Sequence, residues 1–313
     1  MTVPQLVILS GKGGTGKTSL TAALADLAWG DGPELVLVDA DVDASNLDLV
    51  LNCQRVQQEV FQGRALAQID PKLCSACGRC KEVCRFEAVI QDLTSFRIDS
   101  LACEGCAACL YECPENAIMM KPVNAGEWYI SETDFGRLFH AHLYPAQENS
   151  GKLVAHIKRQ ALDFLEERAA GSWMLVDGPP GIGCPVISAI SGADAVLAVT
   201  EPSLSGIHDL KRLLNTVDYF GVPSYVAVNK ADIYPQGVQK IEALCRETGA
   251  VLLGKIPFDL DIPKSMAAGI PVTKFRPDGA AASSIKDLWI NICQLKSSRN
   301  PRVQVLDYKI KID

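Results

Sequence analysis

The stretch from Ser10 to Ser19 has the residue types and spacing of a loop that wraps phosphate groups. Its sequence, SGKGGTGKTS, satisfies the pattern G-x-x-x-x-G-K-[ST] between an apolar run and a helix-like stretch. Glycines without a Cβ let backbone N–H groups turn toward an anion at the positive end of the following helix. Lys17 would contact the β and γ phosphates, and the Thr18 hydroxyl would hold Mg²⁺. The residues expected to bind the nucleotide are Gly11, Gly13, Gly14, Thr15, Gly16, Lys17, Thr18 and Ser19.

Carboxylates follow two other apolar runs. Asp39 and Asp41 come after the run at 34–38, and Asp177 comes after the run at 173–176. Ligands of open α/β sheets gather at the carboxyl ends of strands, so these side chains are candidates for Mg²⁺ and water. The alternatives are an acidic turn that caps the next helix, for Asp39 and Asp41, and a plain strand-ending turn, for Asp177.

Eight of the twelve cysteines form two nearly identical runs. Each run has the spacing C-x2-C-x2-C-x3-C, first from Cys74 to Cys84 and then from Cys103 to Cys113. This is the spacing of bacterial ferredoxins, in which the fourth cysteine of a run ligates the other cluster. It assigns Cys74, Cys77, Cys80 and Cys113 to one [4Fe-4S] cluster, and Cys103, Cys106, Cys109 and Cys84 to the second. Zinc fits poorly, because zinc sites need C-x2-C pairs with a longer spacer.

The elements that must position these residues are those of an α/β protein with an insertion. Apolar runs near 6–9, 34–38, 173–176, 195–199 and 225–228 read as buried parallel strands, and 152–168 reads as an amphipathic helix. We expect a mostly parallel twisted sheet with helices on both faces, divided into residues 1–68 and 123–300. A small α+β ferredoxin-like domain would occupy 69–122, and a strand-like tail 301–313.

The overall composition narrows the class of protein. Thirty Lys and Arg against 37 Asp and Glu give a net charge of −7, which disfavours a general nucleic-acid binder. We expect a cytoplasmic protein without a membrane span, since no leader and no apolar stretch of about 20 residues is found. Twelve cysteines then favour metal or redox chemistry over disulfides.

The phosphate loop carries a second lysine, Lys12, and so resembles the deviant Walker A motif of the MinD/ParA/Mrp ATPases. The resemblance implies that Lys12 reaches a partner's phosphates across a dimer with ATP at its interface. It also implies that Asp41 orients the attacking water, Asp39 supports the Mg²⁺ shell and Asp177 is the Walker B carboxylate. ATP or ADP and Mg²⁺ are the expected ligands, in a homodimer or a heterodimer with a paralogue.

Three residues near the end of the sheet are expected to contact the base. Asn229-Lys230-Ala231-Asp232 looks like the guanine-reading motif of GTPases, but in MinD-like proteins the corresponding Asn contacts adenine, which we favour. Pro257 lies where the family makes backbone contacts to the base. Outside the two runs, Cys184 resembles a switch II cysteine that holds a shared cluster in the nitrogenase iron protein. Our expectation for Cys184, as for Cys53, Cys245 and Cys293, is nevertheless a small buried apolar residue, and the cluster ligand is the alternative for Cys184.

Three functions are compatible with these motifs. The first is an ATPase that couples nucleotide state to electron transfer through two [4Fe-4S] clusters, with a redox partner. The second is a carrier that delivers clusters to client proteins, as Mrp-type relatives do. The third is a positioning ATPase of the ParA or MinD kind, which the acidic charge disfavours.

Overall fold

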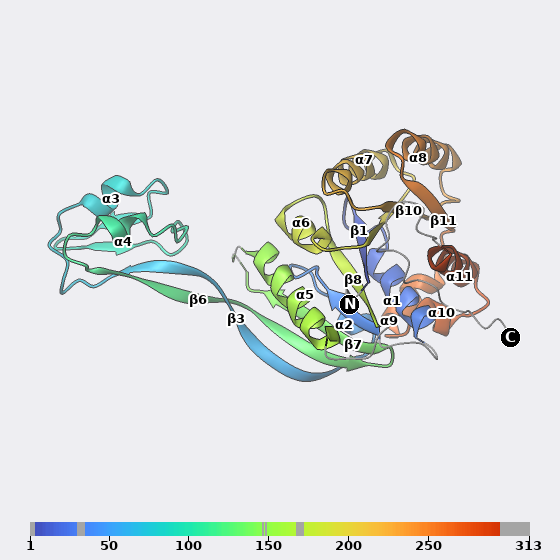
Figure 1. The fold of residues 1–313 in the computed structure, drawn as a ribbon, viewed down its shortest axis with the longest axis horizontal. Helices are drawn as coiled ribbons and strands as arrows, with labels where there is room; N and C mark the ends of the chain where they lie inside the picture. Colours follow the sequence, from blue (N-terminus) through green and yellow to red (C-terminus); the bar gives the residue numbers. More distant parts are fainter. Residues whose placement is uncertain (1–3, 30–34, 146, 148, 167–171, 295–313) are drawn as a thin grey trace. The chain divides into compact units, whose positions relative to one another are not determined.

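The structure is a computed structural model, and it describes residues 4–29, 35–145, 147, 149–166 and 172–294 (Figure 1). The predicted tail at 301–313 lies outside the described residues. The chain divides into two compact units. One contains the residues up to Glu59, Trp128–Leu143 and those from Ser150 onward, and the other contains Val60–Glu127 and Tyr144–Asn149.

A nine-stranded sheet has the order β11-β10-β9-β1-β8-β2-β7-β6-β3. Its strands are β1 Gln5–Ser10, β2 Leu35–Asp39, β3 Gln54–Ile69, β6 Ile118–Thr133, β7 Gly136–Leu143, β8 Trp173–Pro180, β9 Ala195–Thr200, β10 Ser224–Asn229 and β11 Val251–Ile256. All neighbours from β11 to β7 pair in parallel. β6 and β7 are joined by Asp134 and Phe135 alone, a link short enough only for antiparallel strands. The predicted mostly parallel sheet is confirmed.

Helices cover both faces of this sheet. They are α1 Lys17–Ala28, α2 Leu47–Val50, α5 Ser150–Glu166, α6 Cys184–Ile190, α7 Leu204–Tyr219, α8 Pro235–Thr248, α9 Asp261–Ala267, α10 Val272–Phe275 and α11 Ala280–Cys293. Leu6 and Ile8 of β1 join the core formed with α1 and α11. Val7 and Leu9, equally buried, point to the other face because successive strand residues alternate. Central strands buried on both faces explain the continuous apolar runs of the sequence.

The predicted strands and the predicted helix lie where the sequence indicates. The run at 173–176 is the start of β8, and the amphipathic stretch at 152–166 is most of α5, which packs on α6 and β7. The sequence did not predict β7, the strand that lies beside β2 in the sheet. It alternates polar and apolar residues less regularly than a half-buried strand, and its histidines are not typical strand formers.

The second unit contains both cysteine runs. Between β3 and β6 it has α3 Arg79–Val83, α4 Ala108–Glu112 and the antiparallel pair of β4 Val89–Gln91 and β5 Phe96–Ile98. Its core includes Phe96, Val89 and Ile118, packed with cysteines of both runs. The predicted limits of 69 and 122 fall inside this unit, because its first strand, β3, reaches its end only at Ile69 and β6 continues through 122.

Among the described residues, no helix has the length and apolarity that crossing a bilayer requires.

Candidate functional site

The glycine-rich loop lies between the end of β1 and the start of α1. Gly14 and Gly16 have φ values of 77° and 91°, which glycine adopts without the steric cost of a Cβ. Gly16 has a second reason to be glycine, because a Cβ there would collide with Nδ2 of Asn229. Gly11 is similarly confined, since its Cβ would lie 2.6 Å from the backbone of Asp209. The packing therefore requires glycine at both conserved ends of the motif pattern.

Lys17, the motif lysine, is buried at the head of α1 and makes an ion pair with Asp177 at the end of β8. The Lys17 Nζ to Asp177 Oδ1 distance is 2.9 Å. Thr18 donates to Asp177 Oδ2 at 2.7 Å, and Thr21 donates to Oδ1 at 2.9 Å. Asp177 is fully buried, so three side chains of one helix compensate its desolvation. The structure thus brings together Lys17, Thr18 and Asp177, as the sequence indicates, and adds Thr21, which no motif identified.

Asp39 is also fully buried, at the end of β2. Its Oδ2 accepts hydrogen bonds from the Ser45 hydroxyl at 2.8 Å and from the backbone N–H groups of Asn46 and Leu47 at 3.1 and 3.0 Å. Asp39 therefore satisfies the open N–H groups at the start of α2, which was the alternative interpretation from the sequence. Asp41 lies closer to the loop, with its Oδ2 3.8 Å from Lys17 Nζ.

Burial and neighbouring charges shift the pKa values of Asp39, Asp41 and Lys17. Burial, and then the nearby carboxylate of Asp177, raise the pKa of Asp39 to about 7. Burial also raises the pKa of Asp41. Burial lowers the pKa of Lys17, but the charges of Asp177, Asp39 and Asp41 outweigh that effect and raise it overall. Three carboxyl groups around one ammonium leave an excess of negative charge, which a divalent cation would neutralise.

Lys12 does not extend into solvent. Its Nζ lies 2.6 Å from Glu201 Oε1 and donates to Ser205 Oγ at 3.0 Å. Lys230 Nζ holds the other oxygen, Glu201 Oε2, at 3.0 Å. Burial opposes ionisation of Glu201, but its hydrogen bonds to Lys12, Lys230 and Ser203 lower its pKa to about 2. Glu201 is therefore a functional candidate that the sequence analysis missed, because nothing in the local pattern at the end of β9 indicates its partner.

Of the three residues expected to contact the base, Asn229 contacts the loop directly. Asn229 Nδ2 donates to the Thr15 carbonyl at 2.8 Å, and its Oδ1 accepts from the Lys230 N–H at 2.9 Å. Asp232 Oδ1 accepts from the backbone N–H of Phe258, next to Pro257, at 2.6 Å. Asn229 thus stabilises the loop through a hydrogen bond to its backbone, and Asp232 holds the segment that contains Pro257.

The remaining loop residues differ in how far they are tied to the rest of the protein. Ser19 donates to the Met266 sulfur at 2.6 Å, which connects α1 to α9. The Thr15 hydroxyl is buried and has no hydrogen-bond partner in the described part of the chain. Gly13 and Gly14 are exposed, and a Cβ on either would meet nothing within 4 Å. The exposed centre of the loop leaves its backbone N–H groups accessible to a ligand.

The eight cysteines of the two runs line two separate cavities in the second unit. One cavity is lined by the four thiols of Cys74, Cys77, Cys80 and Cys113, with Phe96 and Ile118. The other is lined by Cys84, Cys103, Cys106 and Cys109, with Val89 and Ile98. In each cavity three cysteines come from one run and the fourth from the other. This grouping is the one that the crossed spacing predicts.

The two runs also share their backbone conformation. Ala76 and Gly105, each two residues after the first cysteine of a run, have φ values of 55° and 66°. Gly78 and Ala107, one residue after the second cysteine, have φ values of 82° and 63° and precede α3 and α4. The sequence repeat is therefore a structural repeat, in which left-handed residues bend each loop around its thiols.

In each cavity one thiol, that of Cys80 or that of Cys109, is hard to ionise without a cation. Burial, followed by the proximity of Cys74 and Cys77, raises the pKa of Cys80. Burial, followed by Cys103 and Cys106, raises the pKa of Cys109. Four converging thiolates repel one another, and soft metal ions relieve this repulsion. The donor set fits an iron-sulfur cluster in each cavity.

Cys184 requires a correction. The expectation of a small buried apolar residue is wrong, because Cys184 is exposed at the first residue of α6. Proline at the next position starts the helix at the surface, which explains the exposure. Cys245 is buried as expected, and burial raises its pKa to about 11. Cys53 and Cys293 are partly buried against the main core.

Comparison with known proteins places this arrangement in a family. Residues 6–272 match the family described as CobQ/CobB/MinD/ParA nucleotide binding domain. An uncharacterized protein of Methanocaldococcus jannaschii is 33% identical over 288 residues, which cover 92% of this chain and 95% of that protein. An iron-sulfur cluster carrier protein of Pyrococcus horikoshii is 26% identical over 305 residues, covering 91% of this chain and 83% of the carrier.

The fold has solved counterparts as well. The septum site-determining protein MinD of Pyrococcus horikoshii, complexed with Mg-ADP, superposes with a TM-score of 0.56 at 19% identity. The match covers 94% of this chain and 97% of that structure. At this identity the likeness concerns the fold alone. The match over residues 6–272 and the 33% identical relative together show that the chain belongs to the CobQ/CobB/MinD/ParA nucleotide-binding family.

Proposed function

We propose that this protein is an ATPase whose nucleotide state is coupled to electron transfer through two [4Fe-4S] clusters. The observation that carries the proposal is the grouping of the eight cysteines into two cavities, four thiols in each, as crossed cluster ligation requires. The ATPase part is supported by membership of the nucleotide-binding family and by the loop around Lys17. ATP or ADP with Mg²⁺ would bind at the exposed centre of the loop.

The side chains around the loop have separable roles in this proposal. Lys17 would move from Asp177 toward the β and γ phosphates, and Thr18 would turn from Asp177 toward Mg²⁺. Asp177 would then face Mg²⁺ and balance its charge. Asp41 is less buried than Asp39 and Asp177, and it would orient the attacking water. Asp39 would act through its hydrogen bonds to the start of α2. Lys12 would leave Glu201 and contact the phosphates of a partner subunit.

The clusters would be held by the two cysteine groups of the second unit. When bound, each cluster would accept and release one electron at a time. The protein would contribute thiolate ligands and apolar walls such as Phe96 and Val89. The main segment of the cluster-binding unit, Val60–Glu127, begins after β2 and α2 and ends before β7. Along the chain this segment therefore lies between Asp41 and Asp177, two carboxylates of the nucleotide site.

The test is the reduction potential of both clusters with and without nucleotide. Protein purified without oxygen would be titrated under electron paramagnetic resonance, first alone and then with Mg-ATP. Couplings between sites of roughly 1 to 3 kcal/mol correspond to shifts of roughly 45 to 130 mV, at about 59 mV per tenfold change. We expect a shift in this range. Equal potentials with and without Mg-ATP, in protein that hydrolyses ATP, would refute the coupling.

Lys17→Met is the control for this titration. It removes the charge that would contact phosphate and preserves most of the side-chain volume in a buried position. The variant should keep both clusters and lose the response to Mg-ATP. A response that persists in Lys17→Met would show that ATP acts elsewhere. Circular dichroism checks that the variant is folded. We expect it to be, because Asp177 keeps its hydrogen bonds from Thr18 and Thr21.

Cluster delivery is the second candidate, and a specific observation favours it. Proteins named iron-sulfur cluster carrier from Pyrococcus horikoshii and Pyrococcus abyssi are 26% and 25% identical to this chain. Four cysteines around each cavity favour a firmly held cluster instead. Mixing the loaded protein with an apo-ferredoxin distinguishes the two. Transfer of intact cluster that ATP accelerates would support delivery, and retention of both clusters would support electron transfer.

A further inference from the structure

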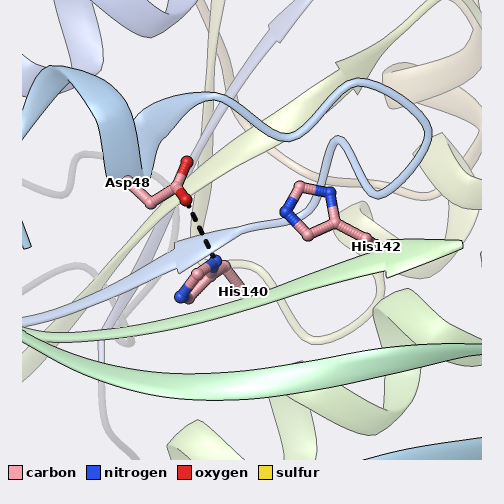
Figure 2. Close-up of side chains that lie close together, drawn as sticks. All are labelled: Asp48, His140 and His142. Atoms are coloured by element: carbon pink, nitrogen blue, oxygen red, sulfur yellow. Dashed lines mark ion pairs between the residues drawn. The ribbon is translucent and has the colours of Figure 1, made fainter. Parts of the chain in front are cut away.

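A second group of potential metal ligands lies away from the cysteines and the phosphate loop. It consists of Asp48 on α2 and of His140 and His142 on β7 (Figure 2). One ligand atom from each residue lies within 4.8 Å of the others. His140 and His142 are two apart on one strand, so both side chains point to the same face. The three residues come from segments almost a hundred positions apart in the chain.

His140 has an unsatisfied nitrogen aimed at this group. Its side chain is 1% exposed, and Nδ1 has no hydrogen-bond partner within the described ranges. The nearest acidic atom, Asp48 Oδ2, is 4.0 Å from Nδ1, too far for a hydrogen bond. Figure 2 shows the Asp48 carboxylate directed at the His140 ring, with the ring of His142 beside them. A buried nitrogen left without a partner is costly, which calls for a group between these atoms.

The other nitrogen of the His140 ring contacts a serine. Nε2 lies 2.9 Å from the buried hydroxyl of Ser131. When that hydroxyl accepts from Nε2–H, Nδ1 keeps a lone pair that can bind a metal ion. A hydrogen bond on the far nitrogen is the usual way in which a protein orients a metal-binding histidine.

The facing atoms of this group leave a gap that a cation would fill. Asp48 Oδ2 and His140 Nδ1 lie 4.0 Å apart with no hydrogen bond between them. A bound cation would accept a coordinate bond from each of these atoms. Arg55, a neighbouring cation, is held on the ring of Tyr129, with its guanidinium carbon 3.8 Å from the ring centroid.

We propose that Asp48, His140 and His142 form a binding site for one divalent first-row transition-metal ion of the zinc type. Two imidazoles and one carboxylate exclude Mg²⁺ and Ca²⁺ as preferred ions, because those ions take oxygen ligands. Ligands on one tetrahedral zinc ion lie about 3.3 Å apart, given bonds of about 2.0 Å. The partly exposed side chains of Asp48 and His142 need only small rotations to reach that spacing.

The position of the site suggests its effect. The metal would join α2 to β7, and α2 begins at the N–H groups that Asp39 caps. β7 in turn pairs in parallel with β2, the strand that ends in Asp39. The ion would therefore fix the segment that follows the carboxylates of the nucleotide site. This inference concerns residues of the first unit and is independent of the cysteine cavities.

The experiment measures Co²⁺ and Zn²⁺ binding to the full-length protein with Mg-ADP present. We expect one equivalent to be lost in Asp48→Asn and in His142→Gln relative to the wild type, with a Co²⁺ spectrum that lacks thiolate charge-transfer bands. His208→Gln is the matched control, because His208 is an exposed histidine 3.3 Å from Asp209. Equal binding in the wild type and in both ligand variants would overturn the proposal, as would loss of the equivalent in His208→Gln.

Two further measurements do not depend on replacing a ligand. Ser131→Ala removes the hydroxyl that supports His140 Nε2 and should weaken Zn²⁺ binding by about 10- to 100-fold. The chain has four histidines, so ¹⁵N-histidine spectra of the wild type distinguish them. Zn²⁺ should shift the ring signals of His140 and His142 and leave that of His208 in place. Unshifted signals of His140 and His142 at saturating Zn²⁺ would overturn the proposal even if a ligand variant failed to fold.

Discussion

The ion pair between Lys12 and Glu201 makes a quantitative prediction about assembly. If Lys12 reaches a partner's phosphates in the ATP-bound dimer, each subunit must first release it from Glu201. The variant Glu201→Gln keeps an oxygen acceptor of the same shape and removes its charge. Both side chains are largely covered, with exposures of 29% for Lys12 and 19% for Glu201. The charge removed is therefore only partly screened by water.

The magnitude follows from the geometry. Two charges 2.6 Å apart attract by about 6 kcal/mol at an effective dielectric constant of about 20. Hydration cancels most of this, and a hydrogen bond to a charged group contributes about 1 kcal/mol more than a neutral one. Two subunits release two lysines, so Glu201→Gln should favour the dimer by about 2 kcal/mol. That difference corresponds to a dissociation constant about 30-fold lower, at 1.4 kcal/mol per tenfold.

Sedimentation velocity with a non-hydrolysable ATP analogue measures this dissociation constant. Glu247→Gln is the control, because Glu247 pairs with Lys211 at a comparable 3.0 Å outside the loop. It should leave the dimer unchanged. The double variant Lys12→Ala/Glu201→Gln should show no gain over Lys12→Ala. A Glu201→Gln dimer that is no tighter than the wild type would refute the view that Glu201 restrains Lys12 in the monomer.

The loop, a buried carboxylate and the cysteine cavities support three more predictions. Gly16→Ala should lower the free energy of unfolding by roughly 1 to 3 kcal/mol, because φ is 91° and the added Cβ would collide with the Asn229 side chain. Urea denaturation measures this change, and Gly13→Ala is the control because a Cβ at Gly13 meets open space. In chelated, nucleotide-free protein, the raised pKa of Asp39 contributes stability that is present below about pH 3.8 and is lost as the pH rises through about 7. The melting temperature of the wild type should therefore fall between about pH 3.8 and pH 7, and Asp39→Asn should make this fall smaller. A variant with the same pH profile as the wild type would contradict the prediction. Cys113→Ser and Cys84→Ser should each alter a different cluster signal in electron paramagnetic resonance, as the two cavities require; loss of the same signal in both would exclude crossed ligation.

The sequence determined those features that depend on neighbours along the chain. The phosphate loop needs glycines at fixed spacings before a lysine at the head of a helix, and this pattern can be recognised without a structure. The cysteine spacing likewise predicts the crossed grouping around two cavities, because the fourth cysteine of each ferredoxin-type run ligates the other cluster. Buried parallel strands leave continuous apolar runs, which located β1, β2, β8, β9 and β10 and the carboxylates at their ends.

Other features depend on how segments meet in the fold, and the local sequence alone does not decide them. Glu201 becomes a partner of Lys12 because β9 lies beside β1 in the sheet. Asp39 caps α2 because the chain folds back over the end of β2, a role that a D-x-D pattern does not distinguish from metal binding. The exposure of Cys184 is set by where α6 begins on the surface.

The histidines of β7 are the clearest example of what the tertiary structure decided. In the sequence they are two polar residues in a weakly patterned stretch, far from Asp48. The parallel pairing of β7 with β2 brings them to α2 and buries His140 with one nitrogen unpaired. The physical reason is that the pairing of distant strands is stabilised by the apolar core on both faces of the sheet. This pairing brings together polar side chains whose proximity neither residue spacing nor secondary-structure propensity indicates.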